Sequence, residues 1–130
     1  MMSNSRESEF PILEKERVPC LGLNATLKEA LDIMTAKNLG VCVFLDSNDC
    51  VIGLLTDGDL RRLILTRQHP LPSLLVSPAL DFGSLRPTIV EQGESLDRII
   101  DIMDTKGIWD VPIVNKSGKF VGIVNRHVKN

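Results

Sequence analysis

The sequence has 130 residues, of which 43% are hydrophobic and 25% charged, and its formal net charge is −2. These totals are typical of one ordinary globular domain, or of two small halves that share a core. They argue against a nucleic-acid-binding protein, which carries a basic face, and aromatic residues at 4% are too few for base stacking. No apolar run reaches the roughly 18 residues of a membrane-spanning helix, and no signal-peptide pattern is found. We therefore expect a cytoplasmic protein without membrane or nucleic-acid partners.

The three cysteines, Cys20, Cys42 and Cys50, are odd in number and have no C-x-x-C spacing. This pattern argues against a zinc site and against a disulfide framework. Cys42 lies within an apolar run and is expected to be a buried thiol in a reducing compartment.

The chain contains an internal repeat. A shift of 69 residues, from Gly53 to Gly122, places TLKEALDIMTAKNLG (26–40) on SLDRIIDIMDTKGIW (95–109) without a gap. The same shift continues over VCVFLDSNDCVIGLLT (41–56) and DVPIVNKSGKFVGIVN (110–125). The apolar pattern and the turn signals agree along the whole register, so we predict two copies of one structural unit.

Each unit is predicted to begin with a helix and to continue as a hairpin. Thr26 and Ser95 are candidate N-caps, followed by apolar residues at helical spacing, and Asn38 and Gly107 suit the two helix ends. Two β-branched runs then flank a polar turn, SNDC in the first unit and KSGK in the second, which indicates a β-hairpin. The predicted fold class is α+β.

These signals set the expected boundaries. Polar residues at the start indicate a flexible segment over 1–16. The first repeat is expected over 17–69, with a strand near Val18–Leu23 and a second helix over 57–69. A connector with four prolines follows over 70–87, and the second repeat over 88–130, with a strand near Thr88–Val90 and a last helix cut short at the end of the chain.

The stretch LLTDGDLRR (54–62) lies at the junction between a predicted strand and a predicted helix. A threonine followed three residues later by an acid, as in Thr56 and Asp59, is first of all a helix cap. The same helix N-terminus also offers N–H groups to a phosphate, and Gly58 allows a ligand to approach the backbone. The two interpretations are compatible, because a ligand can replace a cap.

The other candidate residues near the junctions can each be explained by a structural role as well as by a functional one. Asp57 and Asp59 are two residues apart, so on a helix they point away from each other and make a poor metal site. Arg61 and Arg62 suit a solvated face or a phosphate contact. Trp109 suits packing or adenine stacking.

The helix–hhhD–turn–hhGhhTxxD pattern, given twice, resembles a tandem CBS-domain pair (the Bateman module) over about residues 17–129. GLLTDGDLRR is similar to CBS pairs attached to sugar-phosphate isomerases of the arabinose-5-phosphate type and to sugar-nucleotide transferases. The resemblance implies two β-α-β-β-α units with pseudo-two-fold symmetry and facing sheets. It also implies two clefts that often hold adenosine nucleotides, and a flat dimer of two pairs that dock through helices.

In that family the threonine hydroxyl meets the phosphate and the aspartate carboxylate meets the ribose diol, which implies these roles for Thr56 and Asp59. Asn125 and Val128 stand at the equivalent positions of the second unit, and Val128 offers no acceptor to a ribose. We therefore expect at most one well-formed nucleotide site per chain. The candidate ligand-binding residues are Thr56, Asp57, Asp59, Arg61, Val43, Phe44, Pro112, Ile113, Asn125, Arg126 and His127.

Nothing in the sequence pairs a nucleophile with a base, forms a metal-binding cluster, or makes a glycine-rich phosphate loop. The resemblance instead implies a non-catalytic regulatory module that senses AMP, ADP or ATP, without an obligatory cofactor. Such a module would form a homodimer and modulate an attached or associated enzyme. Two alternatives stay open: a ligand-free dimerisation module, and a binder of a sugar nucleotide or an S-adenosyl compound.

Overall fold

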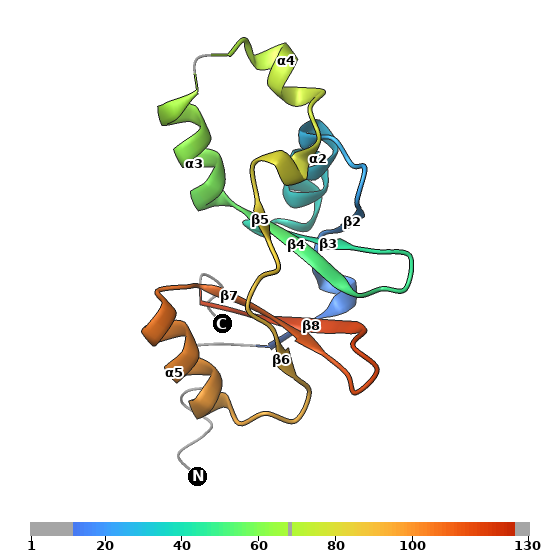
Figure 1. Cartoon of the computed structure of the whole chain (residues 1–130), viewed down its shortest axis with the longest axis vertical. Coiled ribbons are helices and arrows are strands. Elements are labelled where there is room, and N and C mark those ends of the chain that lie inside the picture. Colours follow the sequence, from blue (N-terminus) through green and yellow to red (C-terminus); the bar gives the residue numbers. More distant parts are fainter. Residues whose placement is uncertain (1–11, 68, 127–130) are drawn as a thin grey trace.

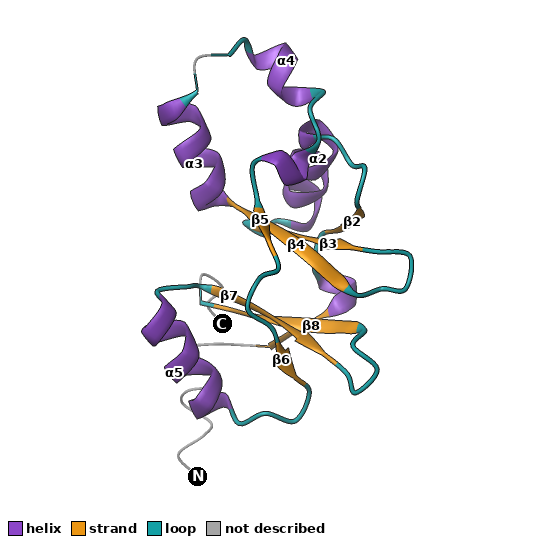
Figure 2. Cartoon of the chain, in the orientation of Figure 1, coloured by secondary structure: helices purple, strands orange, loops and turns teal. Residues whose placement is uncertain are grey.

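The computed structural model describes residues 12–67 and 69–126, which form two four-stranded sheets and their covering helices (Figures 1 and 2). One sheet has the strand order β2-β3-β4-β5 and the other β1-β8-β7-β6. The α+β prediction is confirmed. The elements are β1 (Ile12–Glu14), η1 (Lys15–Arg17), β2 (Cys20–Gly22), α2 (Leu27–Lys37), β3 (Val41–Leu45), β4 (Val51–Thr56), α3 (Asp57–Thr66), α4 (Leu71–Leu75), η2 (Ala79–Asp81), β5 (Ser84–Leu85), β6 (Val90–Glu91), α5 (Leu96–Lys106), β7 (Asp110–Val114) and β8 (Phe120–Asn125).

The repeat seen in the sequence extends to the backbone angles. α2 ends at Asn38 with φ 52°, and α5 ends at Gly107 with φ 64°, both in the left-handed region that stops a helix. The hairpin turns contain Asp49 with φ 63° and Gly118 with φ 82°. Each pair is separated by the same 69 residues, so the two units turn at the same points of their chains.

The hairpin turns also repeat their hydrogen bonds. The Oδ1 atom of Asp46 accepts from the N–H groups of Asn48 and Cys50 at 2.8 and 3.0 Å. Its counterpart Asn115 accepts through Oδ1 from Ser117 and Lys119 at 2.9 and 3.0 Å. An oxygen at this position folds each turn back on itself, whether the side chain is a carboxylate or an amide.

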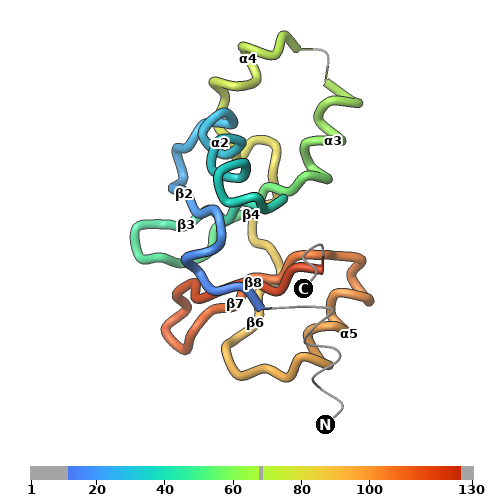
Figure 3. The backbone as a smooth tube through the Cα atoms, turned by 180° about the vertical axis from the view of Figure 1, so that it is seen from behind, coloured from blue at the N-terminus to red at the C-terminus, as the bar shows by residue number. Residues whose placement is uncertain are grey.

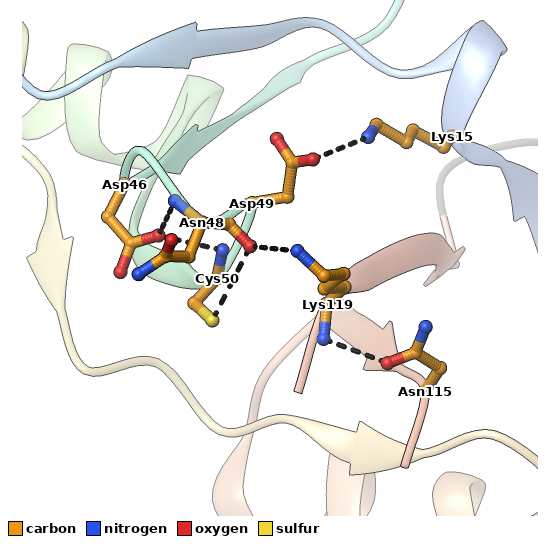
Figure 4. A network of polar contacts seen from close by, with 7 residues as sticks. All are labelled: Lys15, Asp46, Asn48, Asp49, Cys50, Asn115 and Lys119. Atoms are coloured by element: carbon orange, nitrogen blue, oxygen red, sulfur yellow. Dashed lines mark hydrogen bonds and ion pairs between the residues drawn. The ribbon is translucent and has the colours of Figure 1, made fainter. Parts of the chain in front are cut away.

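The two turns lie side by side and touch (Figure 4). The N–H of Phe120 donates to the carbonyl of Asp49 at 2.9 Å, and the Lys119 ammonium donates to the carbonyl of Asn48 at 2.9 Å. The contact ties the first repeat to the second on the side of the molecule away from α3 and α5 (Figure 1).

The two repeats exchange their edge strands. β1 precedes the first repeat but pairs antiparallel with β8 of the second. β5 lies in the connector before the second repeat but pairs antiparallel with β4 of the first. The expected flexible segment over 1–16 is therefore corrected over 12–16, which forms β1 and part of η1; residues 1–11 lie outside the described residues. The expected connector 70–87 likewise contains α4, η2 and β5.

Each sheet has one face toward the other sheet and one toward helices (Figures 1 and 3). Between the sheets lies a cluster of buried side chains from both repeats: Leu13, Val18, Leu39, Val41, Val43, Leu45, Leu54, Phe120 and Ile123. On the outer faces, separate clusters pack beneath α2, α3, α4 and η2 in the first repeat and beneath α5 in the second. The shared inner cluster makes the two repeats one body.

The expected burial of Cys42 is confirmed, since its side chain is fully buried in the outer cluster of the first repeat. Burial raises the pKa of the Cys42 thiol to about 12 and that of Cys20 to about 11. At pH 8 only about one Cys42 side chain in ten thousand is then a thiolate, the form that reacts with alkylating agents.

We therefore expect iodoacetamide at pH 8 to alkylate Cys42 at least about 100-fold more slowly in the folded protein than in urea, because unfolding returns the pKa to its ordinary value. Mass spectrometry of time-resolved digests measures the rate at each cysteine. Equal rates for Cys42 with and without urea would contradict this placement of the thiol.

Candidate functional site

The candidate site begins at the junction of β4 and α3. Thr56 is the N-cap of α3, and its hydroxyl oxygen accepts from the N–H of Asp59 at 3.2 Å. In return, the Oδ2 atom of Asp59 accepts from the N–H of Thr56 at 2.9 Å, which completes a capping box. The predicted cap is thus present, and the carboxylate of Asp59 is 9% exposed.

The second oxygen of Asp59 binds an arginine one helical turn further on. The Arg62 guanidinium donates to Oδ1 of Asp59 at 2.5 Å, while 63% of the Arg62 side chain stays exposed. The same guanidinium reaches back over Gly58, where a Cβ atom would stand 3.5 Å from Nη1. A largely exposed positive charge therefore lies across the N-terminus of α3, bound there to one carboxylate oxygen.

Asp57 points to a different side of the junction. Its carboxylate lies against Gly40, the residue that precedes β3, and its N–H donates to the Gly40 carbonyl at 3.0 Å. The expected divergence of Asp57 and Asp59 is thus observed. Within residues 12–67 and 69–126, no cluster of three or more His, Cys, Asp or Glu side chains could hold a metal ion.

The equivalent junction of the second repeat is occupied by different side chains. Asn125, in the place of Thr56, is fully buried and donates through Nδ2 to the carboxylate of Asp110. Arg126, in the place of Asp57, pairs with Asp104 at 2.7 Å, and its guanidinium lies 5.3 Å from the ring centre of Trp109. The polar groups of Asn125 and Arg126 are thus engaged by other side chains of the same repeat; His127 and Val128 lie outside the described residues.

The strand residues expected at the site divide between two faces. Val43 lies in the cluster between the sheets, and Pro112, its counterpart in β7, is also buried. Phe44 and Ile113 belong instead to the outer clusters, beneath the helices of each repeat. Phe44 and Ile113 therefore do not face the space between the two sheets, because neighbouring residues of a strand point to opposite faces; a ligand contact at any of the four residues stays a prediction.

Two features of the junctions were missed in the sequence. Arg61 was expected at the site, but Arg61 is exposed, and the neighbouring Arg62 binds Asp59. The i, i+3 spacing of Asp59 and Arg62 on one helix was the available signal. Asp110 was also missed, although its position opposite Asn125 in the predicted hairpin follows from the register of the repeat.

Comparison with known proteins defines the family. The CBS domain model matches residues 10–66 and 81–127, which together are most of the chain. The chain belongs to the CBS domain family. Its two matched segments correspond to the two repeats, so this protein is a tandem CBS pair. Among the described residues, no helix of this CBS pair has the length and apolar character needed to cross a membrane.

Curated relatives of this CBS pair include longer proteins. It is 29% identical over 112 residues to the arabinose 5-phosphate isomerase KdsD of Salmonella typhimurium, covering 86% of this chain and 33% of the isomerase. It is 27% identical over 112 residues to the uncharacterized protein RP505 of Rickettsia prowazekii, with the same shares covered. The chain thus spans about a third of the length of these two relatives.

Solved structures of CBS proteins share the fold. The CBS domain protein PAE2072 from Pyrobaculum aerophilum, complexed with AMP, superposes with a TM-score of 0.74 at 20% identity, covering 85% of this chain and 81% of that one. The CBS domain pair of MJ0100, in complex with 5-methylthioadenosine and S-adenosyl-L-methionine, gives 0.74 at 18% identity, covering 88% and 89%. At these identities the likeness concerns the fold alone.

Proposed function

We propose that this CBS pair is a non-catalytic regulatory module of the cytoplasm that binds an adenine nucleotide (AMP, ADP or ATP) beside the Thr56–Asp59 junction. It would modulate an attached or associated enzyme of sugar-phosphate or sugar-nucleotide metabolism. The fold is shared with CBS proteins solved in complex with AMP, and a relative of about three times the matched length is an arabinose 5-phosphate isomerase.

The observation that carries the proposal is the position of the Arg62 guanidinium, bound to Asp59 and lying over Gly58 at the N-terminus of α3. A phosphate at this helix end would accept from backbone N–H groups and attract Arg62 away from the carboxylate. The Oδ1 atom of Asp59 would then be open to a ribose hydroxyl. In the complex, the phosphate would bind Arg62 and the ribose would bind Asp59, the two residues that form an ion pair with each other in this structure.

Occupancy of this site would alter the contacts that hold α3. The helix is capped by Thr56 and Asp59 and packs through Leu63 on the outer cluster of the first repeat. A ligand that binds the junction shifts the protein toward whichever arrangement of α3 it prefers. Because α3 carries exposed apolar side chains, such a shift would change the surface offered to an enzyme or to a second copy.

The test is titration calorimetry with AMP and with ATP. We expect Asp59→Asn to weaken nucleotide binding about tenfold or more, because the amide can still cap α3 but loses the charged acceptor for the ribose. Asp32→Asn, which removes an exposed carboxylate paired with Lys28 across one helical turn, is the matched control and should bind like the wild type.

The arginines give a second comparison within the same proposal. Arg62→Ala should weaken binding more than Arg61→Ala, since Arg62 is the side chain held on Asp59. Absence of binding heat for every adenine nucleotide would refute the proposal. If binding heat is observed only with a sugar nucleotide or an S-adenosyl compound, the site stands but its ligand belongs to that other class.

The exposed apolar side chains favour a second candidate function, a dimerisation module without a ligand. Ile64 and Leu65 on α3 are each 76% exposed, and Leu71 and Val76 near α4 are 63% and 73% exposed. Exposed large apolar side chains on two consecutive helices are candidates for a surface that a partner covers. Light scattering with and without AMP separates the candidates: a ligand-independent dimer whose melting temperature no nucleotide changes would support this second function.

A further inference from the structure

The outer face of the second sheet has a hollow of about 210 Å³ beside α5. Its floor is apolar, formed by Ile99 of α5, Ile113 of β7 and Val121 of β8. Ile12 of β1 stands at its side and is 55% exposed. The hollow does not involve the Thr56–Asp59 junction, so it is independent of the proposed nucleotide site.

The same place in the first repeat is filled by a segment of the connector. The floor residues have counterparts at the 69-residue shift that belong to the outer cluster or pack against it: Ala30, Phe44 and Ile52. Ala79 and Leu80 of η2 pack with them. The Leu80 side chain lies directly over Gly53, the counterpart of Gly122 at the hollow. The fold therefore receives one apolar side chain at this place.

Backbone hydrogen bonds hold the filling segment in the first repeat. The N–H of Ala79 donates to the carbonyl of Ala25 at 2.9 Å, and the N–H of Leu27 donates to the carbonyl of Ser77 at 2.9 Å. Ala25 corresponds to Glu94, which lines the hollow of the second repeat. A polypeptide that enters the hollow therefore meets the same kind of backbone edge that holds the connector in the first repeat.

The rim of the hollow is acidic, in contrast to its counterpart. Three exposed glutamates line it: Glu14, Glu91 and Glu94. The residues at the equivalent positions of the first repeat carry no charge: Leu85, Gly22 and Ala25. The equivalence of Glu14 and Leu85 follows from the strand pairing, because Glu14 lies opposite Gly122 and Leu85 lies opposite Gly53. Carboxylates thus surround this place only in the repeat where it is open.

Two of the three carboxylates have no cationic partner in the described part of the chain. Glu94 pairs with Arg98 at 3.3 Å across one turn. Within residues 12–67 and 69–126, the ion pairs do not include Glu14 or Glu91. A lysine or arginine that approaches the rim therefore meets two carboxylates without breaking an existing ion pair.

The size of the hollow limits what it can hold. Sites that enclose whole small-molecule ligands have volumes of roughly 300–1,000 Å³, and this hollow has about 210 Å³. Together with the leucine that fills the equivalent place, this size favours one apolar side chain that anchors a longer segment.

We propose that the hollow docks a segment of a partner protein that presents one apolar side chain next to lysine or arginine. The apolar side chain rests on Ile99, Ile113 and Val121, in the way that Leu80 rests in the first repeat. The basic side chains bind the carboxylates of Glu14 and Glu91, which select this partner over a neutral or an acidic one.

The direct test is NMR of the full chain with labelled isoleucine and valine methyl groups. The probe is a short synthetic peptide in which one leucine stands between pairs of lysines. We expect it to shift the methyl signals of Ile99, Ile113 and Val121 with a Kd on the order of 1 mM. A peptide with serine in place of leucine is expected to bind about tenfold more weakly or less, and a peptide with glutamates in place of the lysines should also bind more weakly.

Substitutions at the rim test the choice of a basic partner. Glu14→Gln combined with Glu91→Gln should weaken binding of the lysine peptide about fivefold. Asp32→Asn combined with Asp81→Asn removes the same charge from exposed positions of the first repeat and should bind like the wild type. Equal affinity in the two double variants overturns the proposal.

A substitution on the floor tests the anchor. Val121→Phe places a larger side chain in the hollow and should abolish the shifts at Ile99 and Ile113, with the melting temperature as the check on folding. No shift at the hollow at about 10 mM peptide, or equal shifts with the serine peptide, overturns the proposal. Floor signals that change with protein concentration in the absence of peptide would assign the hollow to a second copy of the chain and also overturn it.

Discussion

Replacing Phe120 with alanine is expected to lower the free energy of unfolding by about 4 kcal/mol. Phe120 is 2% exposed and lies in the cluster between the two sheets, against side chains of both repeats. Its removal leaves a cavity at the contact that joins the repeats, and the lost packing is added to the lost burial of the ring. Urea unfolding followed by circular dichroism measures the change.

The same experiment tests whether the repeats unfold together. Because they share the inner cluster, we expect one transition in the wild type, shifted as a whole in Phe120→Ala. Leu23→Ala serves as the control, with a change within about 0.5 kcal/mol for an exposed side chain. Two transitions, of which the substitution moves only one, would show that the inner cluster does not couple the repeats.

Gly122→Ala is expected to destabilise the protein by about 3 kcal/mol, the range of an overpacked core. A Cβ atom at Gly122 would stand 2.5 Å from the carbonyl oxygen of Leu13, which is backbone and cannot rotate away. β1 would have to leave its pairing with β8. Urea unfolding gives the energy, and hydrogen exchange at the β1 amides should report the loss of that strand.

Gly22→Ala provides a matched control for this substitution. Gly22 also lies in a strand, β2, but an added Cβ atom there has nothing within 4 Å. We expect little loss of stability, since alanine also reduces the conformational freedom of the unfolded chain. Similar losses for Gly22→Ala and Gly122→Ala would mean that strand propensity, and not the close approach of β1, explains the effect.

The sequence was sufficient to predict the repeat and most of the elements, because the long helices and the hairpins carry strong periodicity and cap signals. The exchange of β1 and β5 between the repeats could not be predicted from the sequence, and the reason is physical. β1 has three residues and β5 has two, which is too short for an alternating pattern to be read. Their pairing depends instead on Gly53 and Gly122, where the missing side chains let another backbone approach.

At the candidate site, the sequence predicted the local geometry but not the role of the carboxylate. The spacing of Thr56 and Asp59 predicted the capping box correctly, but a cap and a ligand-binding junction require the same geometry. The sequence alone therefore could not assign the carboxylate to one role. The contact with Arg62 is what the structure adds, since it identifies a positive charge that the carboxylate holds in place.

The strand exchange has a consequence for a break in the polypeptide between α3 and α4. A fragment ending there would contain β1 but lack β5, and the other fragment would contain β5 but lack β1. Each fragment alone would leave one sheet with an unpaired edge and expose the apolar groups of the inner cluster to water. Each also carries the strand that its partner lacks, so association would complete both sheets at once. This CBS pair thus has the architecture of a split protein whose halves restore one another.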